Sequence, residues 1–166
     1  MTMEEFELFQ NEFNSGNISQ SEYWKRWRTV WDASKGFASH FNGDIERRDK
    51  ILGEIFCRYP DQRDSFMTQS ERKKLFDLPR LLTVFRGGQQ STIAGWSWTL
   101  ERERAEHFAR SGATDDRPLL AIAYDFPSEA ILAYLSSNGY SEVIIDPLTI
   151  TIESAEFSRI HFERIK

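Results

Sequence analysis

Three polar residues with chemically versatile side chains each lie in a segment that otherwise has the composition of a strand. Arg86 ends the run LLTVF, Ser97 stands between two tryptophans in GWSWTL, and Glu142 begins the run EVII. A glycine pair that begins with Gly87 follows the arginine, so the backbone there can approach a ligand closely. The flexible turn 136–139 precedes the glutamate. Together the three residues form a candidate ligand-binding set.

Each of the three residues also has a purely structural interpretation. Arg86 can form a salt bridge at a sheet edge, Ser97 can be a small residue where another element packs closely, and Glu142 can be exposed at a turn. In GWSWTL, the period of a strand places Trp96 and Trp98 on one face and the two hydroxyl-bearing residues on the other. We expect the tryptophans to pack against a helical layer, because an indole buries a large apolar area.

The elements that must position these residues change in character near Pro79. Before it, aromatic residues recur at the helical spacing i, i+3, i+7 in two sets: Phe6, Phe9 and Phe13, then Trp24, Trp27 and Trp31. The pattern predicts a helix at each set, a third over 44–57 and a short fourth after Ser70; Ser19 and Glu22 fit a capping box for the second. The tryptophan stripe with its interleaved basic residues also fits a nucleic-acid stacking platform. Its regular helical period favours an apolar face packed on a sheet.

The remainder of the chain has mostly strand-like patterns. They predict strands over 81–87, 95–100, 119–126, 141–146 and 149–157, with HFERIK as a final edge. Helices are predicted over 100–110, with Leu100, Ala105, Phe108 and Ala109 facing inward, and from Pro127 to about Leu135; 111–118 reads as a loop. The predicted fold class is α+β, with N-terminal helices packed on a small, mostly antiparallel sheet. We expect a single domain over 1–166, with a helical part (1–79) and a β-rich part (80–166).

Composition limits the functions that this chain can have. With 166 residues, 40% of them hydrophobic, and a net charge of −5, it has the composition of a folded protein with one core. Residues 81–166 contain 8 basic and 12 acidic side chains, so an anion there must be bound by a few placed groups, not by a basic field. Cys57, the one cysteine, lies in an apolar run and is expected to be a buried structural thiol.

Cysteine and histidine spacing gives no metal site, so we expect no metal. The N-terminal residues lack the pattern of a signal peptide, and no apolar run reaches about 18 residues. A cytoplasmic protein without a membrane partner is therefore expected.

Three motifs in a fixed order resemble a known family. They are FRG around Arg86, SWTLERERAEHFA from Ser97, and SEVIID around Glu142. This order resembles the arginine–serine–glutamate class of the ADP-ribosyltransferase fold, found in bacterial toxins and bacteriophage effectors, and it covers about residues 80–150. The resemblance implies a split sheet with an NAD cleft and the transfer of ADP-ribose from NAD to a macromolecule. The acceptor is expected to be a protein, and a nucleic acid stays open. The compact size without a secretion signal looks like a phage or prophage effector that modifies a host factor.

The resemblance also implies a role for each matched residue. Arg86 would bind the pyrophosphate of NAD, a contact that suits its planar fork of donors. The Gly87 backbone would bind the nicotinamide carboxamide, and Phe108 would stack on the nicotinamide ring or, alternatively, face inward from its helix. Ser97 would lie beneath the nicotinamide ribose and orient the catalytic Glu142, which would bind the ribose 2′-hydroxyl. The Ser97 hydroxyl should therefore lie near Glu142 and on the same side of the sheet as Arg86.

Two departures from the family pattern bear on specificity. Arginine-modifying members carry a first glutamate or glutamine two residues before the catalytic glutamate, whereas Tyr140 occupies that position here. Arginine specificity is therefore in doubt, and Tyr140 is a candidate to recognise another acceptor from the turn 136–141. The family's Ser-Thr-Ser is Ser97-Trp98-Thr99 here, which keeps hydroxyls at both outer positions, so Thr99 is also expected to line the NAD cleft. The loop 111–118 would flank the phosphates.

Two other functions fit the same residues. One is a catalytically silent ADP-ribosyltransferase-like domain that acts as a binding or inhibitor module; the missing first glutamate and the tryptophan-rich stripe motivate it. The other is an NAD glycohydrolase that releases ADP-ribose without an acceptor.

Overall fold

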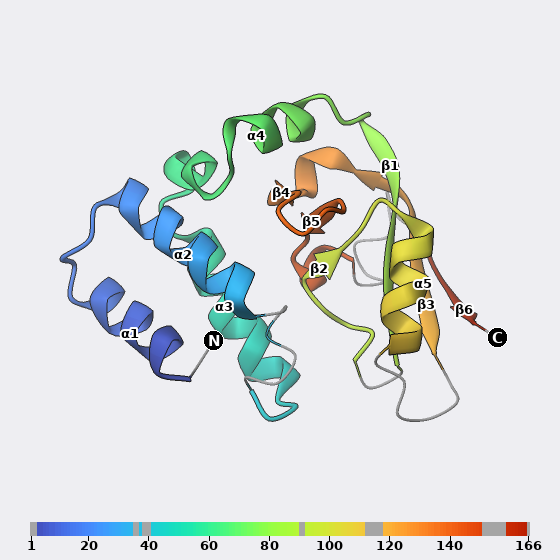
Figure 1. Cartoon of the computed structure of the whole chain (residues 1–166), viewed down its shortest axis with the longest axis horizontal. Helices are drawn as coiled ribbons and strands as arrows, with labels where there is room; N and C mark the ends of the chain where they lie inside the picture. The colour runs from blue at the N-terminus through green and yellow to red at the C-terminus, as the bar shows by residue number, and fades with distance from the viewer. Residues whose placement is uncertain are drawn as a thin grey trace. The chain divides into compact units, whose positions relative to one another are not determined.

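A computed structural model describes residues 3–34, 37, 41–89, 92–111, 118–150 and 159–165. The chain divides into two compact units, Met1–Ser70 and Glu71–Lys166 (Figure 1). The division falls before residue 79, so most of α4 (Gln69–Phe76) belongs with the β-rich unit. The predicted α+β class is confirmed. The expectation that the whole chain is one domain stays a prediction.

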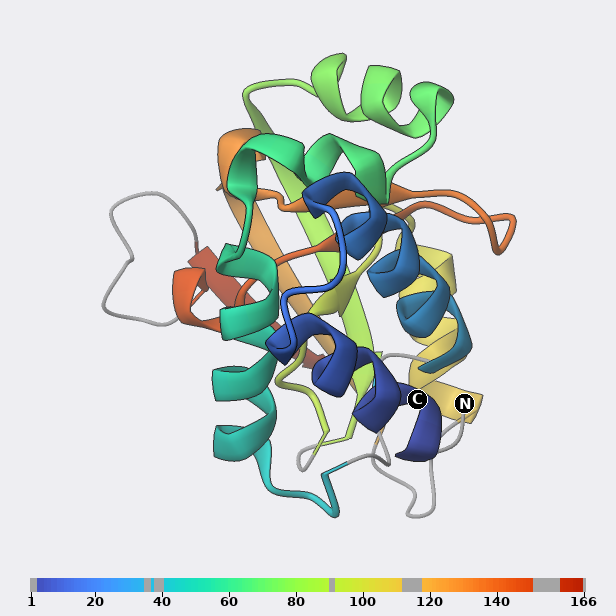
Figure 2. The ribbon, with the colours of Figure 1, turned by 90° about the vertical axis from the view of Figure 1, so that its left-hand side faces the viewer.

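The first unit is helical, as its aromatic periodicity predicts. It contains α1 (Met3–Asn14), α2 (Gln20–Ser34), α3 (Ile45–Cys57) and the 3-10 helix η2 (Pro60–Phe66), which Figure 2 shows from the side of α1 and α3. The hydroxyl of Ser19 accepts a hydrogen bond from the Glu22 N–H at 3.3 Å, and the Asp44 carboxylate accepts one from the Arg47 N–H at 3.0 Å. These side chains satisfy N–H groups that a helix start leaves without partners. Cys57 is exposed at the end of α3, so its predicted burial is wrong.

The tryptophan stripe of α2 forms the core of the first unit. Trp24, Trp27 and Trp31 are buried, and each has a ring contact with Phe56 of α3, at centroid distances of 5.6 to 6.1 Å. Phe9 of α1 stacks on Trp27 from the other direction, at 5.3 Å. The predicted amphipathic helix is therefore confirmed, but these ring partners come from helices and not from a sheet. Buried indoles also have no face to offer to nucleic-acid bases.

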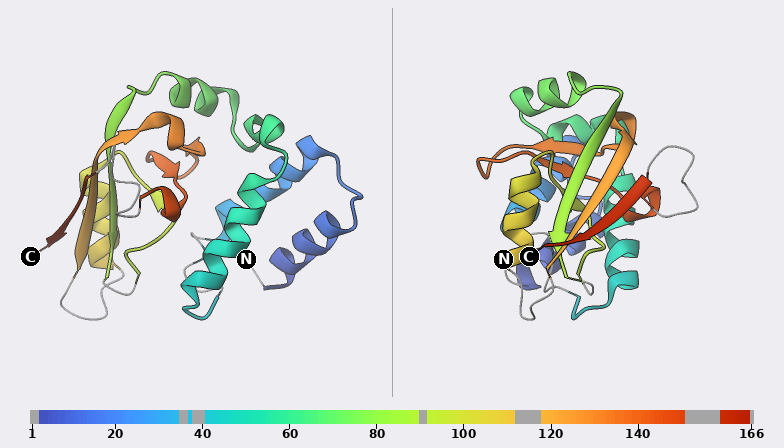
Figure 3. Two further views of the ribbon diagram at one scale, coloured as in Figure 1. Left: turned by 180° about the vertical axis from the view of Figure 1, so that it is seen from behind. Right: turned by 90° about the vertical axis from the view of Figure 1, so that its right-hand side faces the viewer.

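The second unit contains two small antiparallel sheets. The described strands are β1 (Leu81–Gly88), β2 (Ser97–Trp98), β3 (Leu119–Pro127), β4 (Ala133–Leu135), β5 (Glu142–Ile144) and β6 (Arg159–Arg164), and α5 is Arg102–Ser111. One sheet has the order β1-β3-β6, whose strands lie side by side in Figure 3, and the other has the order β2-β5-β4. Among the residues that the structure describes, a single bridge between Phe85 and Thr99 joins them, with both backbone hydrogen bonds at 2.8 Å. The described residues thus contain small antiparallel sheets, as the predicted class requires. The split sheet of an ADP-ribosyltransferase with its NAD cleft stays a prediction.

The core of the second unit lies between the two sheets. Val84, Ala121, Val143 and Ile145 are fully buried there, and Trp98 joins the same cluster. The two tryptophans of GWSWTL are both buried, and Trp98 packs within this β-rich core, where a helical layer was expected. On the other face of the β1-β3-β6 sheet, α5 packs through small residues such as Ala105.

Three sequence predictions in this unit need correction. The helix predicted from Pro127 to Leu135 is a single 3-10 turn, η3 (Ser128–Ala130), followed by β4, which pairs with β5. The strand predicted over 149–157 begins in another 3-10 turn, η4 (Pro147–Thr149), and its residues 151–157 lie outside the described residues. Phe108 does not face inward with Ala105 and Ala109, because 42% of its surface is exposed.

Burial of Tyr23 gives the first unit a testable pH dependence. Its hydroxyl donates to the Ile55 carbonyl oxygen at 2.8 Å, and burial raises the pKa of Tyr23 well above its usual value near 10. Above pH 10 the unfolded chain therefore loses the Tyr23 proton while the folded chain keeps it. Stability should be fully present below pH 10 and should fall by up to about 1.4 kcal/mol per pH unit above it. Guanidinium unfolding at pH 8 and at pH 11 measures the loss.

The Tyr23→Phe variant separates this effect from the other tyrosines. It should cost about 1 kcal/mol at pH 8 through the lost hydrogen bond, and it should lose less stability than the wild type on going to pH 11. Tyr124→Phe, at an exposed position of β3, should behave as the wild type does. An identical alkaline loss in Tyr23→Phe and the wild type would contradict the assignment.

Candidate functional site

The three residues that the sequence singled out converge in the structure. The Ser97 hydroxyl donates a hydrogen bond to Oε2 of Glu142 at 2.7 Å, from β2 to β5. Arg86, at the end of β1, donates from Nη1 to the carbonyl oxygen of Ser97 at 2.6 Å. The predicted proximity of the Ser97 hydroxyl to Glu142 is confirmed. Ser97 therefore links Arg86 to Glu142, through its carbonyl oxygen on one side and its hydroxyl on the other. A hydroxyl that donates to a carboxylate makes a short, charge-assisted bond, which holds the carboxylate in one orientation.

The guanidinium of Arg86 anchors the backbone that leads into β2. In addition to Ser97, its Nε donates to the Ile93 carbonyl oxygen at 2.9 Å and its Nη2 donates to the Thr92 carbonyl oxygen at 3.1 Å. A Cβ on Gly95 would lie 2.3 Å from this guanidinium, so the arginine lies flat against the glycine backbone. The structure therefore assigns Arg86 a positioning task. Its expected contact to a pyrophosphate stays a prediction.

Gly87 has a structural reason of its own to be glycine. A Cβ there would lie 1.7 Å from the carbonyl oxygen of Ala105, which shows how closely α5 crosses β1. Strand alternation directs the Gly87 N–H and C=O to the same edge as those of Phe85, which bond with Thr99. That edge faces the segment that carries Ser97. Its orientation is compatible with the predicted carboxamide contact, which stays a prediction.

A second set of hydrogen bonds holds the residue directly before Glu142. Oε2 of Glu101 accepts from the Ser141 N–H at 2.8 Å and from the Ser141 hydroxyl at 3.1 Å. The hydroxyl of Thr99, a buried residue, accepts from the N–H of Glu101 at 3.1 Å. The hydrogen bonds of Glu101 to Ser141 are here called the Glu101–Ser141 clamp, and Thr99 supports it from inside the protein. The expected role of Thr99 in lining an NAD cleft stays a prediction. Glu101 and Ser141 were not predicted as site residues, because they are forty residues apart and no local signal in the sequence pairs them.

Tyr140 and Phe108 lie together beside Glu142. Their ring centroids are 5.4 Å apart, and the guanidinium carbon of Arg104 lies 4.4 Å from the Tyr140 centroid and 5.5 Å from that of Phe108. Burial and the negative charge of Glu142 raise the pKa of Tyr140, while Asn138 and Arg104 oppose the shift. Tyr140 is therefore a neutral hydrogen-bonding group at physiological pH. The approach of Phe108 to Tyr140 was not predicted, and Arg104 was not singled out by the sequence.

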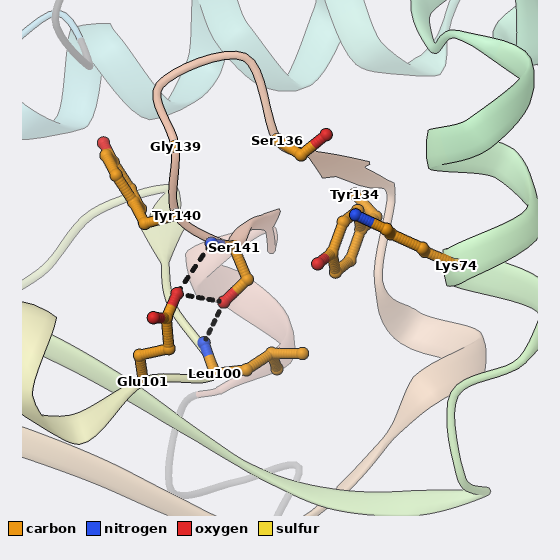
Figure 4. A pocket seen from close by; sticks show the side chains of 8 residues that line it. All are labelled: Lys74, Leu100, Glu101, Tyr134, Ser136, Gly139, Tyr140 and Ser141. Carbon is orange, nitrogen blue, oxygen red and sulfur yellow. Dashed lines mark hydrogen bonds between the residues drawn. The ribbon is translucent and has the colours of Figure 1, made fainter.

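A pocket of about 520 Å³ lies beside the turn that leads to Tyr140 (Figure 4). It is lined by Lys74, Leu100, Glu101, Tyr134, Ser136, Gly139, Tyr140 and Ser141. Figure 4 shows the Glu101–Ser141 clamp at one side and Lys74 over the Tyr134 ring at the other. Burial raises the pKa of Tyr134, and the negative charges of Glu101 and Glu71 add to the effect. Ser97 and Glu142 do not line this pocket, so it is not the expected NAD cleft, which stays a prediction.

Three further expectations concern the loop before β3, a metal site and a membrane-spanning helix. Residues 112–117 of the loop expected to flank the phosphates lie outside the described residues. Within the described ranges, no group of three or more His, Cys, Asp or Glu side chains is placed to hold a metal ion. In the same part of the chain, none of the helices is both long enough and apolar enough to cross a membrane.

Replacing Arg86 by lysine tests its anchoring task. A lysine keeps the charge but has no planar fork, so it cannot reach the carbonyl oxygens of Thr92, Ile93 and Ser97 together. Hydrogen bonds from a charged group contribute about 1.5–3 kcal/mol each, and we expect Arg86→Lys to destabilise the protein by about 2 kcal/mol or more. Thermal unfolding measures this change. Arg80→Lys, at an exposed position just before β1, should change stability by less than about 0.5 kcal/mol; equal effects of the two substitutions would show that the anchor is dispensable.

Comparison with protein-family models, with curated proteins and with solved structures gave no match to this chain. The assignment of a function therefore depends on the geometry of Arg86, Ser97 and Glu142.

Proposed function

We propose that this protein is an NAD-dependent mono-ADP-ribosyltransferase that transfers ADP-ribose to a macromolecular acceptor, expected to be a protein. The observation that carries the proposal is the 2.7 Å hydrogen bond from Ser97 to Glu142, with Arg86 bonded to the backbone of that serine. These are the three residues on which the resemblance to the arginine–serine–glutamate class depends. They come from three strands and are separated by up to 56 positions, so their convergence is not a consequence of local sequence.

The reaction needs the groups that this set provides. Breaking the bond between nicotinamide and ribose develops positive charge on the sugar, in an oxocarbenium-like transition state. A carboxylate fixed near the ribose stabilises that charge as it forms, and this electrostatic contribution is large where the group is already oriented. Glu142 would supply the carboxylate and would bind the ribose 2′-hydroxyl, and Ser97 would hold it in position. Nicotinamide departs as a neutral molecule, so the reaction needs no strong general acid.

The biological setting is part of the same proposal. A compact protein of this kind would act on host proteins in the cell that makes it, as phage and prophage effectors do. The cytoplasm is then its place of action.

A catalytically silent binding module is the second candidate, and one observation favours it. The hydrogen bonds of Arg86 to three carbonyl oxygens and the clamp on Ser141 give these polar residues structural tasks that require no substrate. Calorimetry with NAD, combined with a measurement of nicotinamide release, separates the two candidates. Binding without release supports the silent module, whereas release supports the enzyme. Release without any transfer would favour an NAD glycohydrolase.

Glu142→Gln tests the catalytic carboxylate. The amide keeps the size of the side chain and an oxygen that can accept from Ser97, but it lacks the negative charge that opposes the charge on the sugar. Losing one preorganised electrostatic group costs about 10²–10³-fold in rate, and we expect nicotinamide release to fall by about that factor with little change in melting temperature. High-performance liquid chromatography of nicotinamide gives the rate.

Glu103→Gln is the matched control, because Glu103 is an exposed glutamate in the first turn of α5. It should release nicotinamide as fast as the wild type. A fully active Glu142→Gln protein would mean that the catalytic carboxylate is elsewhere.

A further inference from the structure

The three residues Arg104, Phe108 and Tyr140, here called the Arg104 cluster, form a polar and aromatic surface of unusual composition. A cation lies over two aromatic rings, at 4.4 Å and 5.5 Å from their centroids, and the rings meet each other at an interplanar angle of 66°. Phe108 is 42% exposed. Tyr140 beside it is half-buried. An exposed apolar side chain that adjoins another aromatic ring and is rimmed by a polar group is typical of surfaces that contact a ligand or a partner.

Arg104 differs from the other two arginines of α5 in what its guanidinium contacts. Arg102 pairs with Glu106 and Glu163, and Arg110 pairs with Glu106. Among the described residues, the Arg104 guanidinium forms no ion pair and no hydrogen bond, and its Nε is buried without a partner. A guanidinium has five N–H donors and no acceptor. The rings hold the half-buried Arg104 in place, and the donors of its guanidinium other than the buried Nε can bind an anionic group.

The cluster borders Glu142. Tyr140 lies two positions before it, and the Glu142 carboxylate is close enough to contribute to the raised pKa of the Tyr140 phenol. Under the proposed function, a group that attacks the sugar held by Glu142 approaches along this surface. The charge of the surface then decides which acceptors can approach.

We infer that Arg104 is an acceptor-recognising residue and that the acceptor group is a carboxylate side chain of a protein. This inference rests on the proposed function. An acceptor guanidinium would meet a like charge at Arg104, and like charges placed opposite each other are unfavourable. A carboxylate matches the planar fork of the guanidinium and can accept two parallel hydrogen bonds from it.

The charge of the surroundings favours a single carboxylate over a nucleic acid. Residues 81–166 carry a net charge of −4, and the first turns of α5 contain Glu103 and Glu106 next to Arg104. Binding to a phosphate backbone needs several cations that neutralise successive phosphates. Arg104 alone can bind one carboxylate, but it cannot neutralise a row of phosphates.

The transfer step balances with a carboxylate acceptor and needs no base. The bond between C1 of the ribose and the nicotinamide nitrogen breaks, and its electron pair goes to that nitrogen, which neutralises the ring. A lone pair of the carboxylate oxygen forms the new C1–O bond and gives an ester. No proton leaves the acceptor, so the site needs no group beside Glu142 to remove one.

The experiment offers the full-length protein labelled NAD and three probes. They are a capped neutral peptide with one glutamate, the same peptide with arginine in place of glutamate, and single-stranded oligothymidylate. We expect label on the glutamate peptide, in a linkage that neutral hydroxylamine cleaves as an ester. We expect Arg104→Gln to lower this transfer about 10- to 100-fold, the effect of losing a hydrogen bond from a charged group, and Arg104→Glu to lower it further.

Arg110→Gln is the matched control, because Arg110 is an exposed arginine of the same helix that pairs with Glu106. It should modify the glutamate peptide as the wild type does. Label on the arginine peptide or the oligonucleotide, or unchanged transfer by Arg104→Gln, would each overturn the inference and leave the proposed function intact. Nicotinamide release with no labelled probe would overturn the inference and favour an NAD glycohydrolase. A wild-type protein that releases no nicotinamide would overturn the proposed function itself.

Discussion

The planar guanidinium of Arg86 is the interaction on which the rest of the candidate site depends. Only the bridge between Phe85 and Thr99 joins the two described sheets by main-chain pairing. Arg86 adds hydrogen bonds to the carbonyl oxygens of Thr92 and Ile93 in the connecting segment and of Ser97 in β2, and so satisfies backbone acceptors at this junction. Gly95 has to be glycine so that the guanidinium can lie against it. Through the Ser97 carbonyl, this anchor fixes the hydroxyl that orients Glu142.

A second anchor acts from the opposite direction. Glu101 follows the Ser97 strand and binds Ser141, and Ser141 directly precedes Glu142. Arg86 thus holds the backbone at Ser97, and Glu101 holds the backbone next to Glu142, so both partners of the Ser97–Glu142 hydrogen bond are anchored. A side chain that acts electrostatically benefits from such support, because contacts that restrict its rotation keep its charge at the position where the reaction needs it. The positioning residues are therefore as much a part of the site as the carboxylate.

The sequence was most informative where structure is determined locally. Aromatic residues at helical spacing and the capping residue Ser19 predicted α1 and α2 closely, and the helix predicted over 44–57 matches α3. It was least informative where pairing is distant. Residues 133–135 were expected in a helix, but they form β4 because they pair with β5, whose residues lie seven to eleven positions further along the chain. The convergence of Ser97 and Glu142 was predictable only through the order of the motifs, and the Glu101–Ser141 clamp was not predictable at all.

The position of Phe108 shows why the helical spacing of apolar residues in α5 could not predict the Arg104 cluster. The period grouped it with Ala105 and Ala109, which are fully buried against the sheet. At Gly87 the strand backbone comes so close to α5 that even a Cβ would overlap the Ala105 carbonyl oxygen and the Ala109 nitrogen. An interface this tight admits alanine and excludes a phenyl ring, so Phe108 lies at the flank of the helix, where it meets Tyr140. The small residues that bring α5 against β1 therefore also create the aromatic surface beside Glu142.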